Sequence, residues 1–163
     1  KITMTQTTMT TTKTNQKLPP NPFVSEILEL ASKQKTIAKK IEVLKEYENV
    51  ALKSILIWNF DETAISVLPE GNVPFKPNEA PAGTEHTSLR QEHQYLYNFL
   101  KGGNDTLSPI RKETMFIQIL ENLHPEEADI LILTKDKKLQ SKYKITRDIV
   151  EQSFPDISWG NRS

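Results

Sequence analysis

The 163-residue chain contains no cysteine, so disulfide bonds and thiolate metal ligands are excluded and a reducing compartment is indicated. No apolar run approaches the roughly 20 residues that a membrane-spanning helix needs. The first twenty residues also lack the apolar core of a secretory signal. We therefore expect a cytoplasmic protein without membrane contact.

The chain has no excess of charge of either sign. Its 21 basic residues balance its 21 acidic residues, so any nucleic-acid site must depend on local basic clusters. Apolar residues make up only 36%, which is low for a globular protein. The length favours one domain, with room for a tail.

The familiar catalytic motifs are missing. The three histidines, His86, His93 and His124, are not spaced as in HExxH, and each is explained by a solvated position or a helix cap. The glycines in KGGN at 101–104 lack the Walker spacing and suit a helix C-cap followed by a turn. No GxSxG occurs. We expect no enzyme activity, no cofactor and no metal.

Apolar residues at helical spacing predict an all-α single domain of about six or seven helices over residues 21–163. Residues 1–20, rich in threonine, are expected to form a disordered tail. Residues 68–88 form a long proline-rich loop, and residues 156–163 a C-terminal tail. The expected helices cover about 22–32, 36–47, 50–60, 88–100, 109–123, 125–139 and 146–154.

Two local patterns guide these boundaries. Asn21 before Pro22 predicts the cap of the first helix, and Asn49, Ser108, His124 and Thr146 predict later helix starts. The run ADILILT at 128–134 is apolar on every side, so it suits a central helix or a buried strand. Its helix-start residues and its continuation into KDKKL favour a helix.

Basic residues gather in two stretches. The segment 135–147 holds six basic residues and one acid, and it leads into a helix N-terminus, where amide groups favour an anion. A second cluster lies near the start of the chain. The candidate phosphate contacts are Lys135, Lys137, Lys138, Lys142, Lys144 and Arg147, with Lys33, Lys35, Lys39 and Lys40 as the second set. A solvated surface connection is the alternative interpretation.

Two segments resemble a known DNA-binding domain. Residues 26–60, EILELASKQKTIAKKIEVLKEYENVALKSILIWNF, resemble the opening of the helical N-terminal domain of ATP-dependent DNA ligases from T-even-like phages. Residues 131–157, LILTKDKKLQSKYKITRDIVEQSFPDI, resemble its end, with Phe154, Pro155 and Ile157 matching. The catalytic K-x-D-G motif of ligases is absent. The resemblance therefore implies DNA binding without ligation.

Residues 23–163 are also similar to an uncharacterised family from T-even-like myophages of marine cyanobacteria. The likeness is carried by LPEGNVPFKPNEAPAGTEHTSLR, FLKGGNDTLSPIRKETMFIQILE, KDKKL and WGNRS. We expect a non-catalytic duplex DNA-binding protein in the host cytoplasm, acting in phage DNA metabolism. The alternatives are a factor that binds a phage or host protein through Phe75 and Trp159, and a virion or assembly component.

Overall fold

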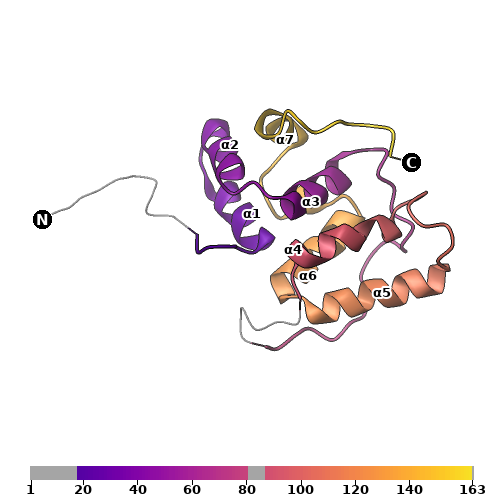
Figure 1. Ribbon diagram of the computed structural model, residues 1–163. Helices are drawn as coiled ribbons and strands as arrows, with labels where there is room; N and C mark the ends of the chain where they lie inside the picture. Colours follow the sequence, from indigo (N-terminus) through magenta and orange to yellow (C-terminus); the bar gives the residue numbers. More distant parts are fainter. Residues whose placement is uncertain (1–17, 81–86, 163) are drawn as a thin grey trace, which may run out of the picture.

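The computed structural model describes residues 18–80 and 87–162, and over these ranges the chain is an all-α domain (Figure 1). The all-α prediction is therefore confirmed, whereas the expected tail falls outside the described residues except for 18–20. The described helices are α1 (Val24–Lys33), α2 (Ile37–Glu46), α3 (Val50–Phe60), α4 (Leu89–Glu92), the 3-10 helix η3 (His93–Phe99), α5 (Pro109–Asn122), α6 (Pro125–Lys135), the 3-10 helix η4 (Leu139–Ser141) and α7 (Arg147–Ser153).

The helices α3 and α6 lie at the centre of the domain and pack against each other. In the view of Figure 1, α2 and α7 lie at the top, α5 runs along the bottom, and α3, α4 and α6 lie between. Ile130 and Leu131 of α6 are fully buried, which explains why ADILILT shows no polar face. The helix predicted over 126–134 is confirmed, but α6 ends at Lys135 and does not continue through KDKKL as expected. Among the described helices, none combines the length and apolarity needed to cross a membrane.

Most helix starts agree with the predicted caps. The side-chain oxygens of Asn49, Ser108 and Thr146 accept hydrogen bonds from backbone N–H groups three residues further on, at 2.8, 3.3 and 3.3 Å. The ring nitrogen Nδ1 of His124 accepts a hydrogen bond of 3.1 Å from the Glu126 amide. These four residues therefore supply acceptors for amides that have no partner inside their helices.

The predicted cap of the first helix is wrong. The N-cap position is Phe23, and the Glu26 carboxylate accepts its backbone N–H at 2.8 Å. Asn21 lies outside the helix with a positive φ of 52°. Asparagine tolerates this left-handed conformation, so the residue serves the turn that leads into α1.

The single helix expected over 88–100 is also wrong. It consists of α4 followed by the 3-10 helix η3, in which residues three apart lie on the same side. Leu96 and Phe99 share that spacing, and both are buried. Leu100 then pairs with Ser66 in an isolated antiparallel bridge. The tighter winding thus places two core side chains before the chain becomes extended.

A buried carboxylate joins three helices. Glu127, near the start of α6, is fully buried, and its oxygens accept the amide of Val24 at 2.8 Å and that of Leu89 at 2.9 Å. Val24 and Leu89 are the first residues of α1 and α4. Helix N-termini carry partial positive charge, so one carboxylate stabilises three of them.

Candidate nucleic-acid interface

Two basic segments, far apart in sequence, meet at the turn between α1 and α2. The backbone N–H of Lys144 donates a 2.9 Å hydrogen bond to Ser32 Oγ. The Lys40 ammonium donates to the carbonyl oxygens of Ser32 at 2.9 Å and Ala31 at 3.3 Å. Lys40 therefore satisfies the carbonyls that end α1, and it lies beside Lys144. We use the name basic surface for the five lysines around this turn: Lys33, Lys35, Lys39, Lys40 and Lys144.

The basic surface keeps most of its positive charge. Burial and the neighbouring charge of Lys144 both lower the pKa of Lys40. Lys35, Lys39 and Lys144 are exposed, and within residues 18–80 and 87–162 none of their ammonium groups has an ion-pair partner. Lys33 pairs with Glu29 at 3.3 Å, but both side chains are well exposed and such pairs are weak. The surface can therefore attract an anion.

Lys135, predicted as a phosphate contact, is instead buried. Its ammonium donates to the carbonyls of Pro69 and Gly71 at 2.8 and 2.9 Å and pairs with Asp136 at 2.9 Å. The side chain thus fastens the start of the proline-rich segment to the end of α6. Since its donors are occupied and shielded from solvent, Lys135 cannot serve as a phosphate contact in this structure.

Lys137 is also engaged within the protein. Its ammonium donates to the backbone carbonyls of Trp58 and Asp61 at the C-terminal end of α3. Burial lowers the pKa of Lys137, although the carboxylates of Asp61 and Glu62 oppose this effect. Lysine near a helix C-terminus satisfies its last carbonyls, and this is the role that the contacts give Lys137.

The remaining residues of the predicted stretch differ in how free they are. Lys142 donates to Asp129 at 2.8 Å and to Glu126 at 3.0 Å; burial opposes its charge, but these bonds outweigh burial and raise its pKa. Arg147 pairs with Glu151 at 2.8 Å. Lys138 is exposed and has no ion-pair partner in the described part of the chain. Of the predicted stretch, only Lys138 and Lys144 present unpaired ammonium groups there.

The aromatic residues predicted as partner contacts are occupied in intramolecular packing. Phe75 and Trp159 are both partly buried against the core. The Trp159 ring lies under the Arg147 guanidinium, whose carbon is 4.6 Å from the ring centroid. Much of the apolar surface of both side chains is therefore buried within the protein, so less of it is available to contact a partner.

The segment after α7 is fastened to the end of α3. Asp61 is buried, and its carboxylate accepts the backbone N–H of Gly160 at 2.8 Å and the guanidinium of Arg162. Burial alone would raise the pKa of Asp61, but hydrogen bonds from Thr63, Gly160 and Arg162 outweigh it and hold the pKa well below its ordinary value.

The two histidines in the described ranges, His93 and His124, do not assemble with other metal ligands. Besides capping α6, the His124 ring packs against Phe23 with centroids 5.1 Å apart. His93 begins η3, and His86 lies outside the described residues. Over the described ranges, no three histidine or carboxylate side chains are grouped as a metal site requires.

The role of Ser32 in joining the two basic clusters was not predicted from the sequence. Nothing in the sequence marks this serine, because its contact with Lys144 joins residues 112 positions apart. The two basic clusters were predicted separately, and Ser32 connects them. No local pattern reports such a contact, since helical periodicity only describes neighbours within a few turns.

The fold and its surface define a small all-α domain in which three exposed lysines without an ion-pair partner in the described ranges, Lys35, Lys39 and Lys144, lie around one turn between helices. The chain belongs to a family of unknown function, DUF6433, whose model matches residues 27–141. No curated protein and no solved structure matches the chain.

Proposed function

We propose that this protein binds the phosphate backbone of duplex DNA through the basic surface and performs no chemistry of its own. Backbone contacts give affinity and orientation with little sequence specificity. The DNA-binding set predicted from sequence is thereby narrowed, because Lys135 and Lys137 are held by backbone carbonyls. Lys138 remains an accessory contact.

The observation that carries this proposal is the pairing of Lys40 with Lys144. The fold holds these two like charges together through Ser32, and burial of Lys40, together with the nearby charge of Lys144, lowers the pKa of Lys40. Like charges in proximity disfavour the charged forms of both groups, and groups with perturbed pKa values cluster at functional sites. A phosphate placed between them would remove the repulsion.

Two further features support an anion at this position. The N-terminal end of α2 lies between Lys35 and Lys39, and a helix N-terminus adds partial positive charge. The α1–α2 turn also lies within residues 26–60, the segment that resembles the opening of the phage ligase DNA-binding domain. On this basis we place the protein in phage DNA metabolism, in the host cytoplasm.

Fluorescence anisotropy with labelled duplex DNA tests the proposal. Lys35, Lys39 and Lys144 are replaced together by glutamine, while Lys40 stays because it caps α1. The matched control replaces three exposed basic residues elsewhere by glutamine: Lys76, Lys101 and Arg111. Both variants lose three charges, so they differ only in where the charges lie.

Log affinity of the unmodified protein should fall linearly with log salt concentration. The slope should flatten by up to about 2.7 in the basic-surface variant, since each phosphate contact contributes about 0.9. The control should keep the original slope. Equal losses in the two variants would mean that net charge alone drives binding, and no binding at low salt would remove DNA as the ligand.

A further inference from the structure

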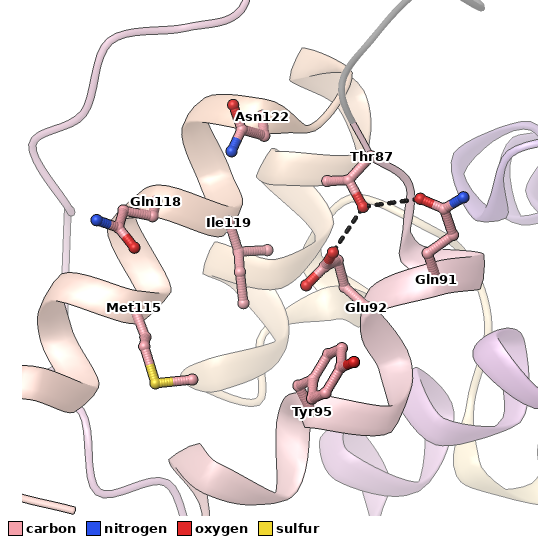
Figure 2. A pocket seen from close by; sticks show the side chains of 8 residues that line it. All are labelled: Thr87, Gln91, Glu92, Tyr95, Met115, Gln118, Ile119 and Asn122. Carbon is pink, nitrogen blue, oxygen red and sulfur yellow. Dashed lines mark hydrogen bonds between the residues drawn. The ribbon is translucent and has the colours of Figure 1, made fainter.

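A groove between η3 and α5, on the side of the domain away from α2 and α7, has a different chemistry (Figures 1 and 2). Its volume is about 520 Å³. Ile119 projects from α5 toward the space between the two helices, and Met115 and Tyr95 flank it (Figure 2). The Glu92 carboxylate lies on the same side as Tyr95 and is turned toward Thr87.

The local winding explains this arrangement. Glu92 immediately precedes the 3-10 helix η3, where residues three apart are eclipsed, so Glu92 and Tyr95 lie on one side. Met115 and Ile119 are four residues apart in an α-helix and therefore share a face. In a continuous α-helix over 88–100, Glu92 and Tyr95 would not be eclipsed but would differ by about 60° around the helix axis.

The carboxylate is oriented but not neutralised. Thr87 Oγ lies 2.6 Å from Glu92 Oε2 and 3.1 Å from Gln91 Oε1. A hydroxyl carries one proton, so the shorter contact is the hydrogen bond that Thr87 donates to Glu92. Thr87 Oγ can then accept a hydrogen bond from Gln91 when the carboxamide N–H of Gln91 faces it. Among the described residues, Glu92 has no ion-pair partner and is the only charged residue lining the groove.

We propose that this groove binds an arginine side chain presented by a protein partner. A guanidinium forms two parallel hydrogen bonds with a carboxylate and stacks on an aromatic ring, and its methylene stem covers apolar surface. Glu92 supplies the carboxylate and Tyr95, a residue that is 46% exposed, supplies the aromatic ring, while Ile119 and Met115 form the apolar floor. The surrounding charge favours a cation, because no basic residue of the described chain lines the groove.

This proposal is independent of DNA binding, since it uses another face and the opposite ligand charge. It is tested with the folded full chain and two peptides, acetyl-Gly-Arg-Gly-amide and the same peptide with citrulline. Citrulline keeps the shape of arginine but is neutral. Backbone amide shifts in nuclear magnetic resonance report where each peptide binds, and the concentration dependence gives its affinity.

The arginine peptide should shift the amides of the groove residues in a saturable way, and the citrulline peptide should not. Glu92→Gln should weaken binding at least about tenfold and Tyr95→Ala about threefold. The controls Glu113→Gln and Tyr97→Ala change exposed residues outside the groove lining and should bind normally. If Glu92→Gln fails to fold, the affinity of Tyr95→Ala for the arginine peptide tests the proposal instead.

Several results would overturn the proposal. Equal binding of the citrulline peptide would show that charge is not recognised. Shifts centred on another pair of carboxylates, such as Glu126 and Asp129 beside Lys142, would place the site elsewhere. Concentration-dependent dimerisation in sedimentation, abolished by Glu92→Gln, would mean that a second copy of this chain fills the groove instead of a partner.

Discussion

The buried carboxylate of Glu127 gives the sharpest stability prediction. Replacing Glu127 by glutamine keeps the size of the side chain but removes its charge and one of its two acceptor oxygens. Only one of the amides of Val24 and Leu89 can then be accepted. The other faces the new NH2 group, so that two donors oppose each other in a fully buried place.

The magnitude follows from these two bonds. A hydrogen bond to a charged group contributes about 1.5–3 kcal/mol, and a buried donor without an acceptor costs about 1–3 kcal/mol. Glu127→Gln weakens one bond and abolishes the other, so we expect the free energy of unfolding to fall by about 3 kcal/mol. A small domain is stable by only about 5–15 kcal/mol, so this is a large share.

Urea unfolding followed by circular dichroism near neutral pH measures the change. The control is Glu126→Gln, the neighbouring residue, whose exposed pair with Lys142 should contribute less than about 1 kcal/mol. The two variants remove the same charge from adjacent positions of α6. If they lose the same stability, the carboxylate of Glu127 does not hold the starts of α1 and α4 together.

Three further predictions concern other buried contacts. Leu131→Ala should lower the free energy of unfolding by about 2–5 kcal/mol in urea titrations, as loss of a fully buried leucine does; a shift below about 1 kcal/mol would contradict the core assignment. Asp61→Asn should have a lower free energy of unfolding than the unmodified protein at neutral pH. Because the folded pKa of Asp61 lies below its ordinary value of 3.8, its contribution is present above about pH 4 and lost in acid, so the variant should lose less stability on acidification. Lys135→Met should destabilise by about 1–3 kcal/mol and leave DNA affinity unchanged, whereas weaker DNA binding would return Lys135 to the interface.

The sequence predicted the fold well because helices are specified locally. Asn49, Ser108 and Thr146 cap the helices that they were expected to cap, and Ile27, Leu28 and Ala31 form the buried face of α1 as their spacing predicts. Caps and apolar faces depend on residues within one or two turns. Helix caps and buried helix faces can therefore be predicted from short stretches of the sequence.

The site was harder to predict because it depends on distant contacts. The lysines of 135–147 look alike in sequence, yet Lys135 is enclosed by the proline-rich segment and Lys144 is placed beside Lys40. Whether a lysine ammonium is available to a ligand depends on whether carbonyl and carboxylate groups from distant parts of the chain already bind it. The 3-10 winding of η3 was missed for a related reason, since Leu96 and Phe99 fit the apolar face of either helix type.

The fastening of Asp61 has a consequence for the order in which the chain folds. Gly160 and Arg162 lie 99 and 101 positions beyond Asp61, and contacts that close such large loops form slowly. The chain leaves the ribosome from its N-terminus, so α3 is made long before these donors. Burying the Asp61 carboxylate without them would be unfavourable. The end of α3 should therefore reach its final packing only after residues 160–162 have been synthesised and have left the ribosome.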